Sequence, residues 1–347
     1  MENFIDRILE LQPYVIAEIG INHNGDMSLA KEMIDAAYSN GASCVKFQSF
    51  IADNYISKYA TKAAYQKEDI SVSNMSQREI IKKCELSTEQ AIEMQTYAKT
   101  KKIDFLSTPF EILSFRSLME IDVPAIKISS CNLTNIPFLE EVAETKVPVL
   151  LSTGMGTLAE VIDAVEIFRK TKSPIILFQC TSNYPCDIAS ANLKVINTYQ
   201  NLFNIPVGYS DHTTTNTAAI VAVALGAIAV EKHFTISRDL PGIDQKASIE
   251  PQELNDLVKE LKDARGSLGS TIKFQTDEEI DTAVALRRSI VAEHDLEAGY
   301  VLDNSMVVMK RPGDGLPPAM LHILIGKKII NKVLKDEKIL LDHFIKT

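Results

Sequence analysis

The stretch IPVGYSDHTTTNTAAIVAVALGAIAVEKHF, residues 205–234, decides the fold. One apolar run ends at His212, a helical pattern follows over 217–225, and a second apolar run ends at His233. Such runs predict two buried strands joined by a helix. Because the crossover of a βαβ unit returns the second strand parallel to the first, both histidines are expected at the same end of neighbouring strands.

Two imidazoles in that arrangement predict a metal site with open coordination positions. Structural zinc sites are usually closed by four protein ligands, whereas two histidines leave room for water and substrate oxygens. Asp211 and Glu231 lie close to the histidines in sequence and are candidates to orient the two rings. The alternative interpretation is that His212 and His233 only cap buried strands.

The same pattern of an apolar run, polar residues and a helical segment recurs along the chain. Strands are predicted over 14–20, 43–48, 103–110, 125–130, 147–156, 174–185, 205–212 and 227–233. Eight such units in about 250 residues indicate an α/β protein with a (β/α)₈ TIM barrel, whose active site lies at the C-terminal strand ends. A doubly wound sheet would need a GxGxxG loop after its first strand, and GINHNG at 20–25 lacks that spacing.

Sequence patterns also suggest where the barrel ends. A helix over 251–265 is expected to stop at Gly266, so we assign residues 1–266 to the barrel. Residues 267–286 are predicted to be a linker, and 287–347 a small C-terminal domain. Residues 49–86 are interpreted as a long loop of the barrel. Some sixty residues form only a marginal core, so the small domain is expected to dock against another surface.

Composition excludes several classes of function. The 347 residues carry a net charge of −10, which argues against a nucleic-acid partner. The longest apolar run, 218–230, is shorter than the roughly 20 residues that span a bilayer. We therefore expect no membrane partner and a cytoplasmic location. The five cysteines lack CxxC spacing and are expected to be reduced core residues; Cys131 and Cys180 have no base beside them in sequence.

The predicted strand ends carry a specific set of polar side chains. They are Glu18, Lys46, Gln48, Thr108, Lys127, Ser130, Ser152, Tyr184, Ser210, His212 and His233. Lys46 and Lys127 among hydroxyl groups suit a small dianion with phosphate and carboxylate groups, because a buried ammonium is costly without a counter-charge. The alternative pairs each lysine with a neighbouring carboxylate, and Glu18 with a lysine.

Nine sequence blocks carry a resemblance to a known family. The blocks are AEIGINHNGD (17–26), VKFQ (45–48), FLSTPF (105–110), LSTGMG (151–156), CTSNYP (180–185), GYSDHT (208–213), EKHFT (231–235), GIDQKASIEP (242–251) and KRPGDGLPP (310–318). In this order they resemble the sialic acid (N-acetylneuraminate and legionaminate) synthases over almost the whole chain. The resemblance implies a TIM barrel followed by an antifreeze-like (SAF, β-clip) domain, in a domain-swapped homodimer. It also implies a transferase that condenses phosphoenolpyruvate with an N-acyl amino sugar.

The resemblance further implies a role for each matching residue. His212 and His233 would bind a divalent metal, with Mn²⁺ preferred and Mg²⁺ or Co²⁺ as alternatives, and would be catalytic together with Glu18. The phosphoenolpyruvate site would comprise Lys46, Thr108, Lys127, Ser130, Ser152 and Ser210. Glu18, Gln48, Tyr184 and Asp244 would surround the sugar and the reacting carbons. Arg311 would reach the active site of the neighbouring subunit.

One position departs from the family pattern. After the fourth strand the family usually has Lys-x-x-Ser-Gly-Glu, whereas this chain has Asn132 in place of the glutamate. Asn132 is assigned to the sugar site, where an amide can hydrogen-bond but cannot transfer a proton. Residues 47–87 look more like the N-acetylneuraminate and legionaminate synthases than the pseudaminate synthases.

Two acceptors and two rival functions stay open. The acceptors are N-acetylmannosamine and 2,4-diacetamido-2,4,6-trideoxymannose. The rivals are a synthase of a different keto-sugar acid from a phosphorylated aldose, and a non-catalytic barrel that binds a sugar or phosphoenolpyruvate.

Overall fold

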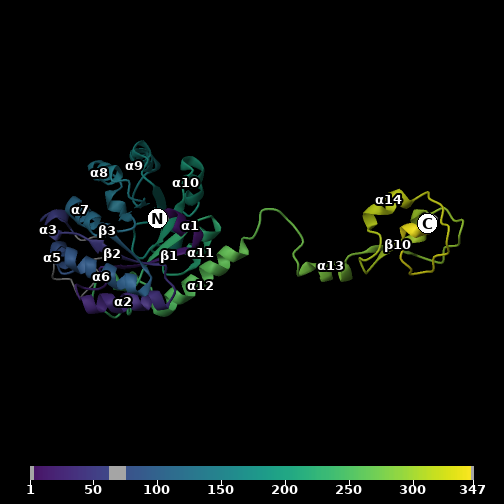
Figure 1. Cartoon of the computed structure of the whole chain (residues 1–347), viewed down its shortest axis with the longest axis horizontal. Coiled ribbons are helices and arrows are strands. Elements are labelled where there is room, and N and C mark those ends of the chain that lie inside the picture. Colours follow the sequence, from purple (N-terminus) through teal and green to yellow (C-terminus); the bar gives the residue numbers. More distant parts are fainter. Residues whose placement is uncertain (1–3, 62–75, 345–347) are drawn as a thin grey trace. The chain divides into compact units, whose positions relative to one another are not determined.

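Eight parallel strands form one sheet that curls into a nearly closed barrel (Figure 1). The hydrogen-bonded order is β3-β2-β1-β8-β7-β6-β5-β4, and β3 also lies beside β4. The strands are β1 (Tyr14–Gly20), β2 (Cys44–Ser49), β3 (Asp104–Pro109), β4 (Ile126–Ile128), β5 (Val149–Ser152), β6 (Ile175–Cys180), β7 (Val207–Asp211) and β8 (Ala229–His233). Every predicted strand is present, which confirms the predicted TIM-barrel fold.

The computed structural model describes residues 4–61 and 76–344. The chain divides into two compact units, Met1–Gly269 and Ser270–Thr347. Part of the predicted 49–86 loop therefore lies outside the described residues. Within those residues, no helix is long and apolar enough to cross a membrane.

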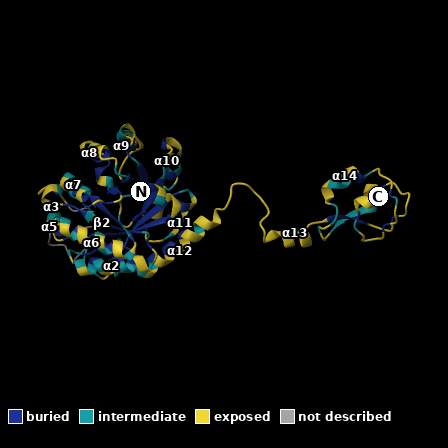
Figure 2. Ribbon diagram, in the orientation of Figure 1, coloured by how far each residue is buried: buried dark blue, intermediate teal, exposed yellow. Residues whose placement is uncertain are grey.

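Helices cover the outside of the barrel and, in the case of the first one, its N-terminal end; their outer faces are exposed while the barrel strands are buried (Figure 2). They are α1 (Phe4–Glu10), α2 (Met27–Ser39), α3 (Ala52–Tyr55), α5 (Gln77–Lys82), α6 (Thr88–Lys101), α7 (Ile112–Glu120), α8 (Ile136–Glu144), α9 (Leu158–Thr171), α10 (Val195–Phe203), α11 (Thr217–Ala224) and α12 (Pro251–Ser267). The predicted stop at Gly266 is wrong, because α12 continues to Ser267.

Several helices begin at side chains that cap them. Asp26 accepts hydrogen bonds from the backbone N–H groups of Ser28 and Leu29 at the start of α2. Ser87 and Thr157 form capping boxes at the starts of α6 and α9. Each cap satisfies backbone donors that the first helical turn leaves unpaired. The polar residues between strands and helices therefore set where each barrel helix begins.

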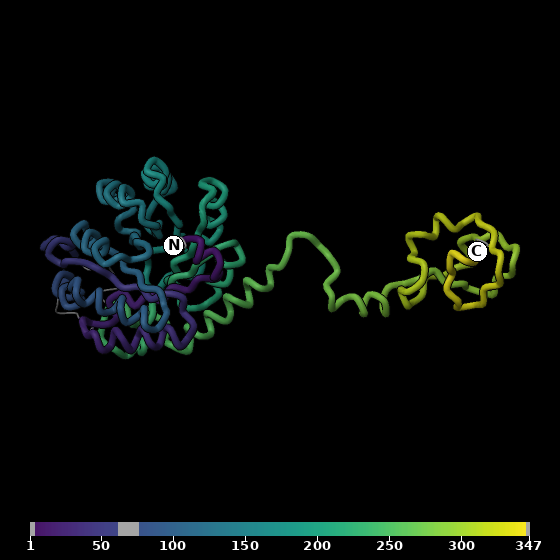
Figure 3. The backbone as a smooth tube through the Cα atoms, in the orientation of Figure 1, coloured from purple at the N-terminus to yellow at the C-terminus, as the bar shows by residue number. Residues whose placement is uncertain are grey.

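Two apolar layers hold the barrel unit together. The larger layer lies between the outward side chains of the strands and the helices. The second layer fills the N-terminal end of the barrel interior, where Phe4, Ile5 and Ile8 of α1 pack against inward residues such as Tyr14 and Ile16. The first and last barrel helices, α2 and α12, lie side by side (Figure 3). The opposite, C-terminal strand ends are left to form the site.

The second unit has a small core of its own. It contains α13 (Glu279–Leu286), β9 (Ser289–Ala292), β10 (Val307–Lys310) and α14 (Leu321–Leu324). Strands β9 and β10 are antiparallel. The buried core residues are Ile290, Ala292, Leu296, Leu302, Leu324, Ile329, Val333 and Ile339.

Candidate active site

A cavity of about 290 Å³ lies at the C-terminal ends of the barrel strands. Most of the predicted site residues line it: Glu18, Lys46, Gln48, Thr108, Lys127, Ser130, Ser152, Tyr184, Ser210, His212, His233 and Asp244. Successive side chains of a strand point to opposite faces, so residues two apart, such as Lys46 and Gln48, enter the cavity together. The strand pattern thus brings polar groups from the ends of all eight barrel strands, or from the loops that follow them, to one place.

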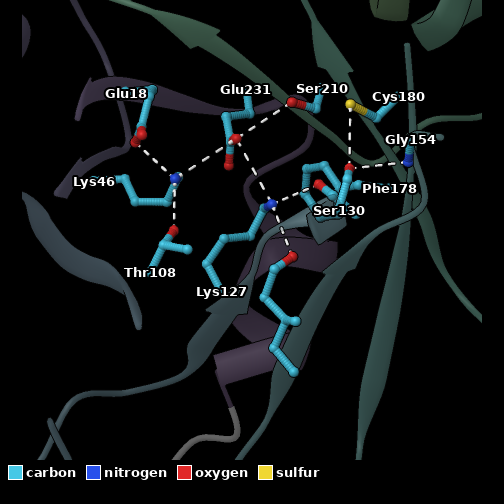
Figure 4. A network of polar contacts seen from close by, with 12 residues as sticks. Glu18, Lys46, Thr108, Lys127, Ser130, Gly154, Phe178, Cys180, Ser210 and Glu231 are labelled. Atoms are coloured by element: carbon cyan, nitrogen blue, oxygen red, sulfur yellow. Dashed lines mark hydrogen bonds and ion pairs between the residues drawn. The ribbon is translucent and has the colours of Figure 1, made fainter. Parts of the chain in front are cut away.

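Lys46, Lys127 and two carboxylates form a chain of contacts across the cavity floor (Figure 4). Lys46 Nζ lies 2.7 Å from Glu18 Oε2 and 3.8 Å from Glu231 Oε1. Lys127 Nζ lies 3.7 Å from the same oxygen of Glu231. The alternative in which each lysine is paired with a carboxylate is therefore present, and Glu231 is shared between the two cations.

Each ammonium group also donates to a hydroxyl group. Lys46 Nζ donates to Thr108 Oγ1 at 2.8 Å, and Lys127 Nζ donates to Ser152 Oγ at 2.5 Å. A hydroxyl oxygen that accepts from an ammonium keeps its own hydrogen available to donate. The two hydroxyl groups are therefore further donors that an anion bound in the cavity could use.

Burial shifts the pKa values of these charged groups. Burial raises the pKa of Glu18 to about 7, although Lys46 opposes that shift. Burial also lowers the pKa of Lys127, against the attraction of Glu231. Burial alone would lower the pKa of Lys46, but Glu18 and Glu231 raise it above its usual value. Lys46 is therefore the more firmly charged of the two lysines. An anionic ligand beside Lys127 would stabilise the charged form of that side chain most.

The two histidines lie together, as predicted. Their ring centroids are 5.6 Å apart, and the Tyr184 ring lies 4.1 Å from His212 and 5.5 Å from His233. His212 Nδ1 is 2.8 Å from the Thr181 carbonyl oxygen, which fixes that nitrogen as the donor; in the neutral ring Nε2 is then an acceptor. Burial holds the pKa of His233 well below its usual value, so this ring is neutral.

The carboxylates predicted to orient the histidines have other partners. Asp211 Oδ2 lies 2.6 Å from Lys232 Nζ, and Glu231 contacts the two cavity lysines. The carboxylate nearest to His233 is instead Asp244, whose Oδ2 lies 3.9 Å from Nδ1. Burial raises the pKa of Asp244 to about 6. The prediction that Asp211 and Glu231 orient the histidine rings was wrong. Each carboxylate is bound to a nearby ammonium group, which is a stronger partner than an imidazole.

The donor set fits a divalent metal with open positions. His233 Nδ1 is buried and has no hydrogen-bond partner among the described residues, and His212 retains Nε2 as an acceptor. No group of three His, Cys, Asp or Glu side chains in the described part of the chain is arranged to hold a metal. A closed structural site is therefore not formed there, and the histidine pair is the candidate.

Two predicted site residues are not among those that line the cavity. Asn132 lines an adjoining cavity, where its Nδ2 donates to the Phe110 carbonyl and its Oδ1 accepts from Asn135. Asn132 ends a short 3-10 turn after β4, and its amide is engaged by these two residues, which counts against its assignment to the sugar site. Arg311 belongs to the second unit and is exposed there.

Sequence reasoning missed several residues that line the cavity. They include Phe50, Tyr55, Phe110, Cys131, Met155, Cys180, Ser182, Glu231 and Ile243. Cys131 is exposed rather than a core residue. Cys180 Sγ lies 3.8 Å from His212 Nδ1, so an imidazole does lie beside it in space, although that nitrogen donates to Thr181. Alternation along β8 places Glu231 on the same face as His233, and that signal was available in the sequence.

Comparison with known proteins extends the match over nearly the whole chain. Residues 33–273 match the NeuB family, and residues 287–345 match the SAF domain. An N,N'-diacetyllegionaminic acid synthase of Legionella pneumophila is 38% identical over 95% of this chain and 94% of that protein. The N-acetylneuraminate-9-phosphate synthase of Homo sapiens is 33% identical over 94% of this chain and 91% of its own length. The crystal structure of N-acetylneuraminic acid synthetase from Leptospira borgpetersenii, in complex with citrate, has 35% identity and a TM-score of 0.69, covering 78% of this chain and 90% of that one.

Proposed function

Because this chain belongs to the NeuB family, we propose that it condenses phosphoenolpyruvate with the aldehyde of an N-acyl hexosamine, giving a sialic-acid-like nonulosonate and phosphate. The observation that carries this proposal is the pair of buried lysines, each bound to a hydroxyl group, beside two clustered histidines in one cavity. The lysines and hydroxyls suit a phosphorylated carboxylic acid, and the histidines suit a polarised aldehyde.

The reaction forms one carbon–carbon bond and breaks one carbon–oxygen bond. C3 of phosphoenolpyruvate attacks the aldehyde carbon, and the aldehyde oxygen takes up a proton. Water forms a new bond to C2 and loses one proton, leaving a hydroxyl group there. The C2–O bond to phosphate then breaks as this hydroxyl becomes the ketone and its proton goes to the phosphate, which leaves with the bridging oxygen. The products are the nine-carbon 2-keto acid and inorganic phosphate, so atoms and charge balance.

The chain contributes mainly by holding two polar reactants together. Lys46 and Lys127, with the hydroxyls of Thr108 and Ser152, are assigned to the phosphate and carboxylate. These fixed donors also stabilise charge as it moves between the enol ester and the leaving phosphate. Glu18 is assigned to the acceptor side of the cavity, where Gln48 Nε2 donates to its Oε1 at 3.0 Å.

His212 and His233 are proposed to hold the divalent metal, with Mn²⁺ as the first candidate. A metal in this position would act as a Lewis acid toward the sugar aldehyde. Asp244 and Tyr184 complete the wall around the two rings. Both side chains are therefore assigned to the acceptor sugar.

The acceptor that we propose is a 2,4-diacetamido-2,4,6-trideoxymannose, with N-acetylmannosamine as the second candidate. The support is the higher identity to the legionaminic acid synthase, 38%, than to the N-acetylneuraminate-9-phosphate synthase, 33%. The same difference in identity makes a phosphorylated sugar a weaker candidate for the acceptor than either of these two sugars.

We also propose a domain-swapped homodimer in which Arg311 serves the partner's cavity. Arg311 is exposed, and the cavity is lined by residues of the first unit. Mixing Arg311→Ala chains with Glu18→Gln chains, each inactive alone, should restore activity after subunit exchange. If mass spectrometry confirms exchange and no activity returns, the in-trans role is wrong.

The decisive experiment measures phosphate release from phosphoenolpyruvate with each candidate sugar and Mn²⁺. We expect phosphate release only when an amino sugar is present, with one nonulosonate formed per phosphate by mass spectrometry. A Glu18→Gln variant is the matched control for contaminating phosphatase. Phosphate release without any sugar, or none with either sugar, would refute the proposal.

A further inference from the structure

A buried ion pair lies on the far side of the sheet from the two histidines. Asp211 and Lys232 are 1% and 2% exposed, and Lys232 Nζ lies 2.6 Å from Asp211 Oδ2. They are register partners on β7 and β8, and each directly precedes a histidine in the sequence. Neither side chain lines the cavity, whereas His212 and His233 do.

Alternation along the strands explains this placement. Ser210 and Glu231 are the preceding register partners, and they meet inside the barrel, with Ser210 Oγ 3.3 Å from Glu231 Oε1. The next pair, Asp211 and Lys232, therefore points outward, and the following residues point inward again. The ion pair thus sits one residue before both imidazoles, across the sheet from them.

The ammonium group of Lys232 binds residues on both sides of His212. Besides Asp211, Lys232 Nζ donates to the carbonyl oxygens of Thr213 at 2.8 Å and Thr215 at 3.2 Å. Asp211 Oδ1 in turn accepts from the Thr213 N–H at 2.8 Å. The residues before and after His212 are therefore both bound to a side chain that belongs to the strand of His233.

Stability alone does not account for this pair. The neighbouring outward residues Val207, Tyr209 and Val230 belong to the apolar layer under the helices. Replacing a buried ion pair by apolar residues of similar size is often neutral or stabilising, because two charges must be taken out of water. A charged pair in this layer is better explained by the geometry that it imposes.

We propose that Asp211 and Lys232 are positioning residues that tie the ends of β7 and β8 together and so set the spacing of His212 and His233. The pair acts from outside the cavity and touches no reacting group. The inference rests on the proposed function only in giving the two imidazoles a metal-binding role. The spacing between His212 and His233 is a property of the protein without metal or substrate.

The test uses the double variant Asp211→Leu with Lys232→Met in the full chain. Both side chains become apolar: methionine has about the length of lysine, and leucine keeps the branching of aspartate with larger ends. The variant also leaves the Thr213 N–H and the carbonyl oxygens of Thr213 and Thr215 without these partners, so we expect it to fold but to melt below the wild-type temperature. The matched control is Lys31→Met with Glu93→Leu, which removes a partly exposed ion pair between α2 and α6 by corresponding substitutions. Single variants are avoided because each would leave one buried charge without its partner.

The first readout is ¹⁵N NMR of the histidine rings in metal-free protein, assigned with His212→Ala and His233→Ala. We expect the ring signals of both histidines to shift or broaden in the Asp211/Lys232 double variant and to stay unchanged in the control. Unchanged ring signals in a folded double variant would overturn the proposal.

The second readout is Mn²⁺ binding by electron paramagnetic resonance without substrates. Loss of orientation at metal-binding histidines weakens affinity roughly ten- to a hundredfold, and we expect a loss of that size only in the Asp211/Lys232 variant. If wild-type protein does not bind Mn²⁺ while the ring signals still shift, the metal assignment fails and the positioning role stands. Wild-type Mn²⁺ affinity in the double variant would count against the positioning role.

Discussion

Replacing Lys127 by Met tests the lysine pair most directly. The change removes one of two cations in the cavity, together with its contact over the Phe178 ring at 5.5 Å from the centroid, and keeps the apolar stem. It also removes the 2.5 Å hydrogen bond to Ser152 and leaves Glu231 with Lys46, at 3.8 Å, as its remaining cation.

The size of the effect follows from these contacts. A hydrogen bond to a charged group contributes about 1.5–3 kcal/mol. This corresponds to roughly a ten- to hundredfold rise in the KM for phosphoenolpyruvate. Glu231 adds to the loss, because a carboxylate with fewer cations beside it repels an anionic ligand. The KM for the amino sugar should change far less, since the acceptor is assigned to the side of Glu18 and the histidines.

The assay is steady-state phosphate release, with one substrate varied while the other is saturating. Lys170→Met, on the exposed face of α9, is the matched control and should leave both KM values unchanged. Adding Glu231→Gln to Lys127→Met removes the uncompensated carboxylate and should recover part of the phosphoenolpyruvate affinity. Equal rises in both KM values, or an unchanged KM for phosphoenolpyruvate, would refute the reasoning.

Three further predictions address the histidines and Asn132. His212→Ala or His233→Ala should abolish turnover without lowering the melting temperature by more than a few degrees, and full activity of wild-type protein after chelation would rule out the metal assignment. Burial lowers the pKa of His23 from 6.5 to about 4, so the unfolded chain takes up a proton first as the pH falls and stability is lost between pH 6.5 and 4. Urea unfolding should show that the free energy of unfolding of the wild type falls by up to roughly 3 kcal/mol over this pH interval. The fall should be absent in His23→Asn and kept in the exposed control His294→Asn. Parallel pH profiles of wild type and His23→Asn would contradict this cause. Asn132→Glu removes a buried donor and should lower stability by about 1–3 kcal/mol in the same assay without changing the preferred sugar, whereas a changed preference would return Asn132 to the sugar site.

Local features of the chain determined the architecture. Apolar runs that end in polar residues located all eight strands, because burial of a strand depends on its own side chains and their alternation. The βαβ crossover then placed His212 and His233 at one end of neighbouring strands, where the structure brings them together. The end of α12 was missed because a glycine inside a helix costs only about 1 kcal/mol relative to alanine, and a side chain at position 266 would enter open space, so nothing there forces the helix to stop.

Tertiary structure decided how the side chains pair. Glu231 was predicted to serve a histidine, yet it lies between Lys46 and Lys127, which come from strands on other sides of the barrel. Asn132 was assigned to the sugar, but the turn after β4 directs its amide to Phe110 and Asn135. The sequence shows which face of a strand a residue occupies, whereas the partner across the barrel depends on strand register and on closure of the sheet. Distances between charged groups therefore follow from the packing of all eight strands, because no single segment contains both members of these pairs.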